Sequence, residues 1–332
     1  INAVSGAKII STGNSISTAG SNGSAVLLGE TNTSLTSTNT KYKTTGSNAH
    51  AINVKAGIAE LTGDTVTTSG SGSHGLSSSG GTIAGSGVTV NIEGEGGVGA
   101  YATTKGDVTL TGASKVTTTV GNATGLFADT NGTVKAASTT VLTKGNNSIA
   151  AKADGGTVTL SEATSLTTSS ASSKGIYSTN AGAVDATGVK VTIDGSNSVA
   201  VSADQSGNII LSDSAINTTT TGGGGIFSST SSTIKATNTT VDTLGDWSTG
   251  VSANAAKVEL IASPVITAGA NSAGIYSGNA GQVTATDSDI TTSGEGSYAL
   301  SVDQGSISVT NATLKTGNAA GIFATIGGDT YI

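Results

Sequence analysis

The sequence predicts an all-β protein folded as a parallel β-solenoid, and three observations lead to this prediction. The chain of 332 residues contains 49 Gly, one Pro and no Cys, and only 11% of its residues are charged. Roughly a third of the residues are Ser or Thr, far more than in an average globular protein. Apolar residues recur every 24 to 26 residues along the whole chain. Such a period is typical of proteins in which each repeat is covered by its neighbours.

The clearest repeated position is an apolar anchor that is usually followed two residues later by Thr. The anchor occurs in thirteen rows, at Ile16, Tyr42, Val66, Val90, Val116, Val141, Leu166, Val191, Ile216, Val241, Val265, Ile290 and Leu314. A second apolar series precedes it by about seven residues, at Val134, Val158, Val184, Ile209, Ile234, Val258, Val283 and Ile307. A third follows the turn glycine, at Leu126, Ile176, Ile226, Ile275 and Ile322, with Ala51, Ala100, Ala150, Ala200 and Ala299 in the rows between.

Each period therefore holds three short segments of alternating polarity, separated by Gly, Asn, Ser and Asp. Alternation with a period of two between such residues is typical of strands and turns, and it leaves no room for a helix. Stacked turns pair each strand in parallel with its copies, which turns the inward residues into continuous columns. The prediction is a single solenoid domain over residues 1–332, with about three strands and 25 residues per turn and roughly 13 turns.

The Thr that follows the anchor shares its face, because residues two apart on a strand point the same way. We therefore expect a column of inward Thr whose hydroxyls hydrogen bond to one another along the axis. The repeat is also doubled, because Gly-Ile-Tyr or a close variant marks every second turn, as at Gly175-Ile176-Tyr177. Since neighbouring strand residues face opposite ways, Ile176 and Tyr177 are not expected to be buried together.

The repeat style resembles that of a known family. Gly-Ile-Tyr punctuation, three strands per turn, the absence of Cys, and segments such as 181–187 (Ala-Gly-Ala-Val-Asp-Ala-Thr) and 280–286 (Ala-Gly-Gln-Val-Thr-Ala-Thr) are similar to the passenger domains of pertactin-like Gram-negative autotransporters. The resemblance covers all 332 residues. It implies a right-handed β-helix that is exported through the outer membrane and then displayed on the cell surface or released. The sequence starts without Met and ends in mid-pattern, so we expect a fragment of a longer passenger that lacks the C-terminal barrel.

Composition argues against several partners and reactions. All 14 basic residues are Lys and the net charge is −7, which makes nucleic acid and anionic membrane surfaces poor partners. No apolar run approaches the ~20 residues that cross a bilayer, so we expect no direct membrane insertion. Close carboxylate pairs occur only at Glu93 with Glu95 and at Asp287 with Asp289. Glycan cleavage needs converging carboxylates, so a glycan-processing β-helix enzyme is a minority alternative. We predict no catalytic residue, metal site or cofactor.

A few residues remain as candidates for partner binding. His50 and His74 each follow a turn glycine by four residues, so they should stack on adjacent turns, where they either share a metal or simply face solvent. Trp247, the sole Trp, either anchors a glycan or protein or packs on the solenoid. Tyr298 lies near the same edge as Tyr101, on a distant turn.

The outward positions beside the anchor carry small polar residues, among them Thr140, Thr167, Thr192 and Thr240. Two such faces could pair through many weak hydrogen bonds. The resemblance implies an adhesin, and we expect self-association, aggregation, biofilm formation or host adhesion through these polar faces. The partner would be a second copy of the chain or a host surface protein or glycan. The alternative is a released effector that binds a host receptor or matrix glycan.

Overall fold

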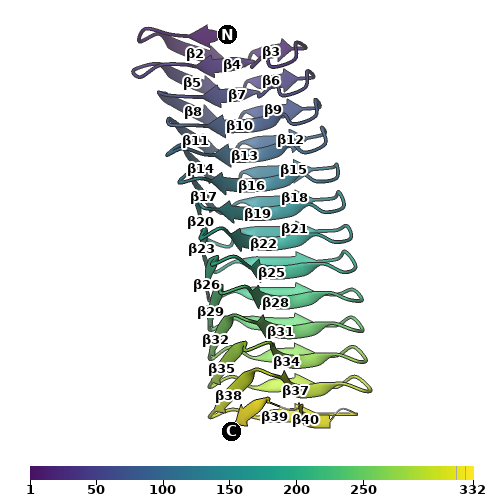
Figure 1. Cartoon of the computed structure of the whole chain (residues 1–332). Helices are drawn as coiled ribbons and strands as arrows, with labels where there is room; N and C mark the ends of the chain where they lie inside the picture. Colours follow the sequence, from purple (N-terminus) through teal and green to yellow (C-terminus); the bar gives the residue numbers. More distant parts are fainter. Residues whose placement is uncertain (319, 326) are drawn as a thin grey trace. The chain divides into compact units, whose positions relative to one another are not determined.

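The computed structural model describes residues 1–318, 320–325 and 327–332. All regular elements of these residues are β-strands, in two compact units: unit 1, Ile1–Leu166, and unit 2, Thr167–Ile332. Each unit is a parallel β-solenoid with three strands per turn (Figure 1). The all-β solenoid prediction is confirmed, and 41 strands at three per turn agree with roughly 13 turns. The single domain expected over residues 1–332 remains a prediction.

Unit 1 contains three parallel sheets, here called A, B and C. Sheet A consists of β1 (Asn2–Ala3), β4 (Val26–Leu28), β7 (Ile52–Val54), β10 (His74–Ser78), β13 (Val98–Ala102), β16 (Thr124–Asp129) and β19 (Ile149–Asp154). Sheet B consists of β2 (Lys8–Thr12), β5 (Ser34–Thr38), β8 (Ile58–Thr62), β11 (Thr82–Ser86), β14 (Asp107–Thr111), β17 (Thr133–Ala137) and β20 (Thr157–Ser161). Sheet C consists of β3 (Ser15–Thr18), β6 (Lys41–Thr44), β9 (Thr65–Thr68), β12 (Thr89–Ile92), β15 (Lys115–Thr118) and β18 (Thr140–Thr143).

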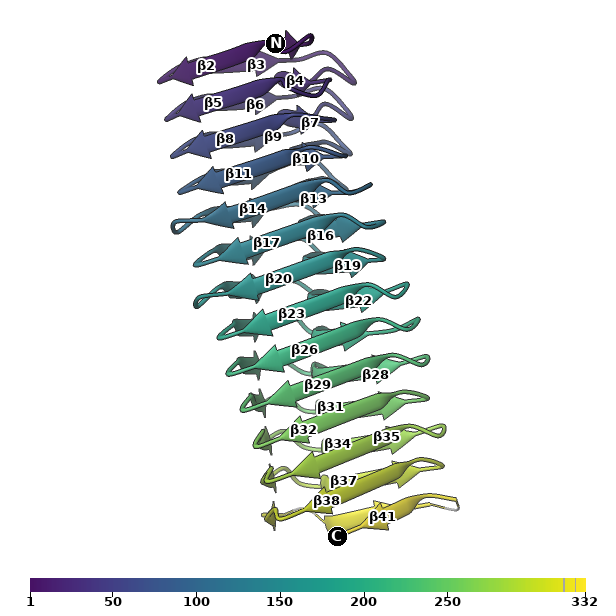
Figure 2. The same cartoon turned by 90° about the vertical axis from the view of Figure 1, so that its left-hand side faces the viewer.

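Unit 2 repeats this arrangement, and β21 (Ser165–Thr168) contains the boundary between the units. Its sheet A consists of β22 (Lys174–Thr179), β25 (Val199–Ala203), β28 (Gly224–Ser229), β31 (Thr249–Asn254), β34 (Ala273–Gly278), β37 (Tyr298–Asp303) and β40 (Ala320–Ala324). Its sheet B, whose strands face the viewer in Figure 2, consists of β23 (Ala183–Thr187), β26 (Asn208–Ser212), β29 (Thr233–Thr237), β32 (Lys257–Ile261), β35 (Gln282–Thr286), β38 (Ser306–Thr310) and β41 (Asp329–Tyr331). Its sheet C consists of β24 (Lys190–Ile193), β27 (Ala215–Thr218), β30 (Thr240–Thr243), β33 (Val265–Thr267), β36 (Ile290–Thr292) and β39 (Leu314–Thr316). No helix in the described part of the chain is long and apolar enough to cross a membrane.

The first two apolar series pair as the sequence predicts. In unit 1, Val90 of the anchor series pairs with Val66 and Val116 on the neighbouring strands of sheet C. In unit 2, Ile209 of the second series pairs with Val184 and Ile234 on sheet B. All of these side chains are buried. The core of each unit is therefore built of like residues that repeat from turn to turn.

The prediction of which residues stack in the third apolar series was wrong by one residue in several rows. Leu126 pairs with Ala151 rather than Ala150, and Ile176 pairs with Val201 rather than Ala200. Ala150 instead lies beside Gly125. A Cβ added to Gly125 would lie 2.6 Å from the carbonyl oxygen of Ala150. Both members of the Ala-Ala or Ala-Val pairs are buried, so hydrophobicity alone did not distinguish them. The outward direction expected of one residue in the Gly-Ile-Tyr motif is confirmed, because Ile176 is buried and Tyr177 is only half-buried.

The Thr column faces inward as expected, but its hydroxyls do not form the predicted chain of hydrogen bonds. Thr44 and Thr243 donate to backbone carbonyls instead. The buried hydroxyls of Thr118, Thr218 and Thr292 have no hydrogen-bond partner among the described residues. Equivalent atoms on stacked strands lie about 4.8 Å apart, which is beyond hydrogen-bond distance when every Thr has the same rotamer.

Serine hydroxyls in the turns, rather than a chain of threonine hydroxyls, form the hydrogen bonds that connect buried groups of successive turns. Ser73 accepts a hydrogen bond from the backbone N–H of Ala49 at 3.0 Å and donates one to the carbonyl of Gly46 at 2.9 Å. In unit 2, Ser297 accepts from the N–H of Ser272 at 3.0 Å and donates to the Gly269 carbonyl at 3.0 Å. Each hydroxyl thus links two successive turns at a corner where the strands end.

Candidate functional site

Three outward features of the solenoid surface are candidates for function. The first, here called the aromatic column, lies along sheet A of unit 1 and the turn before β7, and it consists of His50, His74, Tyr101 and Phe127, with Lys152 at its end. The rings of His50 and His74 stack with centroids 4.5 Å apart and planes 9° from parallel. Tyr101 lies 4.8 Å from His74, and Phe127 lies 5.3 Å from Tyr101. The Lys152 Nζ is 4.6 Å from the centre of the Phe127 ring.

The column is a packed and largely uncharged structure. Burial, with a smaller contribution from His50, lowers the pKa of His74 from 6.5 to about 3. Burial also lowers the pKa of His50. His50 is therefore neutral at neutral pH, and its Nδ1 accepts a hydrogen bond of 3.1 Å from the backbone N–H of His74. The two histidines stack on adjacent turns as expected, and both are half-buried. The described residues contain no group of three or more His, Asp or Glu that could hold a metal ion.

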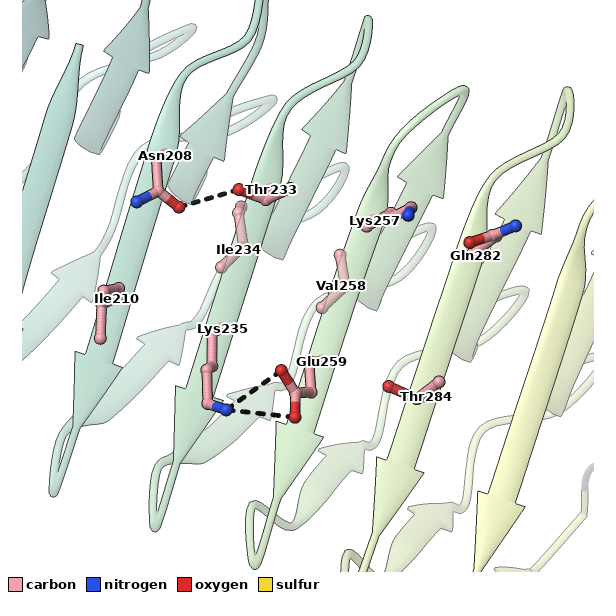
Figure 3. A pocket seen from close by; sticks show the side chains of 10 residues that line it. All are labelled: Asn208, Ile210, Thr233, Ile234, Lys235, Lys257, Val258, Glu259, Gln282 and Thr284. Atoms are coloured by element: carbon pink, nitrogen blue, oxygen red, sulfur yellow. Dashed lines mark hydrogen bonds and ion pairs between the residues drawn. The ribbon is translucent and has the colours of Figure 1, made fainter. Parts of the chain in front are cut away.

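The second feature is a groove on sheet B of unit 2, here called the sheet B groove (Figure 3). Two outward rows line it across four neighbouring strands. One row is Asn208, Thr233, Lys257 and Gln282, and the other is Ile210, Lys235, Glu259 and Thr284. The groove has a volume of about 370 Å³ and is open to solvent. Side chains of successive turns stand side by side because the sheet is parallel and in register.

The sheet B groove contains three charged side chains, of which two form an ion pair. Lys235 and Glu259 form an ion pair of 3.1 Å, and both side chains are nearly half exposed, at 45% and 47%. Lys257 is exposed and forms no ion pair within the described part of the chain. Thr233 donates a hydrogen bond of 2.8 Å to Asn208. Glu259 is the one carboxylate in the lining, so the groove lacks the converging acids that glycan cleavage requires.

Three of the four carboxylates singled out in the sequence serve as local acceptors. Glu95 accepts from the Asn122 amide at 3.2 Å. Asp287 accepts from the Asn311 amide, and Asp289 accepts from the backbone N–H of Thr313 at 2.7 Å. All of these bonds join neighbouring turns. Their geometry is that of turn stabilisation.

The third feature surrounds Trp247, in the turn between β30 and β31 of unit 2. The Trp247 side chain is 67% exposed, so it does not pack on the solenoid. A cleft of about 220 Å³ lies beside it, lined by Trp247, Phe227, Val199, Ile226, Gly222, Gly223, Gly224, Thr249 and Ser252. Tyr298 of the same unit does not line this cleft. It is half-buried, and its ring centroid lies 4.9 Å from that of Phe323.

The four outward threonines lie on sheet C. Thr140 and Thr240 are exposed, whereas Thr167 and Thr192 are half-buried. Thr140 belongs to unit 1 and the other three to unit 2. Sequence reasoning missed the sheet B groove, although Lys235 and Glu259, 24 residues apart at the same place in the repeat, were a usable signal.

Comparison with known proteins supports the fold. No protein family matches the sequence, and no curated protein does either. Among solved structures the chain is similar to Vag8, a Bordetella autotransporter passenger domain seen by cryo-electron microscopy in complex with C1 inhibitor. The TM-score is 0.60 at 17% identity, and the alignment covers 98% of this chain and 97% of the other.

The chain has a β-helix fold similar to that of the Vag8 passenger domain. A likeness at this identity extends to the fold alone. The A-module of a mannuronan C-5 epimerase from Azotobacter vinelandii also aligns, over 98% of this chain and 91% of its own, with a TM-score of 0.42 and 11% identity. A TM-score that low supports no argument about activity.

Proposed function

We propose that the chain is the binding part of an adhesin, displayed on a bacterial surface or secreted, and that it holds its partner through a side face of the solenoid without catalysis. The observation that carries the proposal is the sheet B groove, an open surface with two rows of amide, hydroxyl and charged side chains. Shallow hollows also occur beside it, over Thr233, Lys257 and Gln282, and on sheet B of unit 1, over Glu60, Ala84 and Thr109. A surface of this kind suits many weak contacts with an extended partner.

Side chains rather than the backbone must make these contacts. Strands β29 and β32 are hydrogen bonded to neighbours on both sides, so a partner strand cannot be added to the sheet at the groove. Recognition then depends on Lys257, Thr233, Gln282 and their neighbours. The similar β-helix of Vag8 binds C1 inhibitor, which supports a host protein as one class of partner. A hydroxyl-rich host glycan is the other class that fits this lining.

Charge reversal in the groove tests the proposal. The Lys257→Glu variant is expected to bind cultured epithelial cells roughly tenfold more weakly than the unchanged protein, equivalent to about 1.4 kcal/mol, because it places a second carboxylate beside Glu259. Binding is measured with fluorescently labelled protein at several concentrations. Lys135→Glu, on sheet B of unit 1, is the matched control and should bind as before. Equal binding by all three proteins would remove the groove from the proposal.

Self-association is a second candidate, favoured by the exposed hydroxyls of sheet C. Sedimentation velocity at micromolar concentrations should then show reversible dimers of the unchanged protein. Replacement of Thr140, Thr167, Thr192 and Thr240 by Lys should abolish the dimers, because like charges would face one another across the interface. A monomer at every concentration would exclude self-association through this face.

A further inference from the structure

Trp247 has a backbone conformation that disfavours large side chains. Its φ is 58°, in the left-handed region where a bulky side chain is rare because its Cβ crowds the backbone. The residues with positive φ at the equivalent place in the two units are Asn22, Asn48, Gly72, Gly96, Asn122, Asn147, Ser172, Asn197, Gly222, Asn271 and Gly296. The Trp247 ring is 67% exposed, so burial does not offset the cost. The tryptophan is therefore better explained by contact with a ligand than by folding.

The cleft beside Trp247 has an apolar, aromatic and uncharged lining. Phe227 and Trp247 come from successive turns, and residues 222–224, all Gly, carry no side chain that would fill the space between them. All nine lining residues are uncharged. The Asp246 carboxylate, which precedes Trp247 in the turn, accepts a hydrogen bond of 2.8 Å from the backbone N–H of Ala270. An uncharged ligand is complementary to such a lining.

Two hydroxyl groups of the cleft are free to bind a ligand. Ser252 is only 8% exposed, yet its hydroxyl makes no hydrogen bond within the described part of the chain. The hydroxyl of Thr249, on the same strand, also has no hydrogen-bond partner among the described residues. A hydroxyl both donates and accepts, and leaving a nearly buried one unpaired is costly. A ligand that carries hydroxyl groups would satisfy both.

The cleft is one end of a row of outward side chains on sheet A, here called the sheet A row, which consists of Phe227, Ser252 and Tyr276. Phe227 of β28 pairs with Ser252 of β31, which in turn pairs with Tyr276 of β34. The two rings are therefore two strands apart, or about 10 Å. A Cβ on Gly278 would lie 2.8 and 2.9 Å from two carbons of the Tyr276 ring, so this ring lies flat along its own strand. Its other face is left for a ligand.

The spacing of these rings fits a polysaccharide. The C–H face of a hexose ring is attracted to the negative face of an aromatic ring. In an extended chain of β-1,4-linked hexoses every second unit presents the same face, and two units are about as long as the distance between two alternate strands. Side chains on one face of an extended peptide are only about 6.6 Å apart. A polyproline II helix, with about 9 Å per turn, comes closer and is the competing ligand in the test below.

We propose that the cleft beside Trp247 and the sheet A row bind a neutral, linear chain of β-1,4-linked hexoses that lies along the solenoid axis. One sugar unit occupies the cleft, against Trp247 and Phe227, with its hydroxyls on Ser252 and Thr249. The second unit after it stacks on Tyr276. The cleft volume of about 220 Å³ is below the roughly 300–1,000 Å³ of drug-sized sites, which suits a single sugar unit. The proposal is independent of the sheet B groove, which lies on another sheet.

Sugar length and linkage test this proposal. The probes are the β-1,4-linked hexasaccharides of glucose and of N-acetylglucosamine, the matching disaccharides, and the α-1,4-linked glucose hexasaccharide, whose chain is curved. At least one β-1,4 hexasaccharide is expected to shift the emission of Trp247, the sole Trp, to shorter wavelength. By isothermal titration calorimetry it should bind at least tenfold more tightly than its disaccharide and than the α-1,4 hexasaccharide, because only a long, extended chain reaches both the cleft and Tyr276.

Substitutions of the rings separate the cleft from the row. Trp247→Asn should melt at the same or a higher temperature than the unchanged protein and should bind the hexasaccharide at least tenfold more weakly, whereas Trp247→Phe should bind within threefold. Tyr276→Ser introduces the residue found on both neighbouring strands, at Ser252 and Ser301. It should bind the hexasaccharide no more tightly than the disaccharide, with disaccharide binding unchanged. Lys257→Glu should bind as before, which distinguishes this site from the groove.

Gly224→Val closes the cleft without changing a ring. Its Cβ would lie 3.5 and 3.6 Å from the methyl carbons of Val199, an ordinary contact, so the fold should be unchanged while hexasaccharide affinity falls at least fivefold. Equal binding of the α- and β-linked hexasaccharides, undiminished binding by Trp247→Asn, or no binding of either β-1,4 hexasaccharide at about 10 mM would each overturn the proposal. Binding of a nonaproline peptide in place of both sugars, lost in Trp247→Asn, would assign the cleft to a polyproline II ligand instead.

Discussion

Acidification from pH 8 to pH 5 is expected to lower the free energy of unfolding by about 2 kcal/mol through His74 alone. The pKa of His74 is about 3 in the folded protein and 6.5 when unperturbed. Below pH 6.5 the unfolded chain therefore binds a proton that the folded chain does not, so stability falls until about pH 3. The value pH 5 lies 1.5 units below the unperturbed pKa of 6.5. Each of these units lowers the free energy of unfolding by about 1.4 kcal/mol, which gives the expected total of about 2 kcal/mol. His50, whose pKa is also lowered by burial, acts in the same direction.

Guanidinium unfolding followed by circular dichroism at pH 8 and pH 5 measures this effect. The matched variant is His74→Val, because Val98 occupies the equivalent place on the next strand. Its loss of stability on acidification should be smaller than that of the unchanged protein by about 2 kcal/mol. If both proteins lost the same amount, His74 would not be the responsible group.

The second large effect is expected from Gly70→Ala in a turn of unit 1. A Cβ on Gly70 would lie 1.9 Å from the carbonyl oxygen of Gly46 on the preceding turn. The turns must separate locally to admit the methyl group, and overpacking of this kind typically costs about 1–3 kcal/mol. The midpoint of thermal unfolding, followed by circular dichroism, should fall by several degrees.

Gly20→Ala is the matched control for this substitution. Gly20 occupies the same place in an earlier turn, and no atom lies within 4 Å of the Cβ that would be added. Its unfolding midpoint should change little. A similar fall for both variants would show that close approach between turns is not the cause.

Sequence reasoning succeeded where a residue's direction alone decides its environment. The anchors pair in register from turn to turn, because a shift of one residue between stacked strands would turn the anchors to the outer face. It failed where neighbouring positions share a chemistry, as at Ala150 and Ala151, which are both buried. It also failed for the Thr column, where the spacing between strands exceeds the reach of a hydroxyl.

For the candidate sites too, part could be predicted from the sequence and part could not. Trp247 was identified because its residue type is unusual, but whether its ring is exposed depends on the path of the turn and the Gly-rich surface beside it. The sheet B groove was missed because Thr, Gln, Asn and Lys are ordinary surface residues when read singly. Their proximity exists only when four turns are stacked.

The sequence by itself determined the all-β class, the turn of about 25 residues, the three strands per turn and the inward columns, because these follow from a side-chain period of two repeated along the chain. The tertiary structure decided which outward side chains meet across turns, how the two half-buried histidines stack, and that Trp247 is exposed with a left-handed backbone conformation. These features depend on distances between separate turns, and distances of a few ångströms follow from packing rather than from residue type.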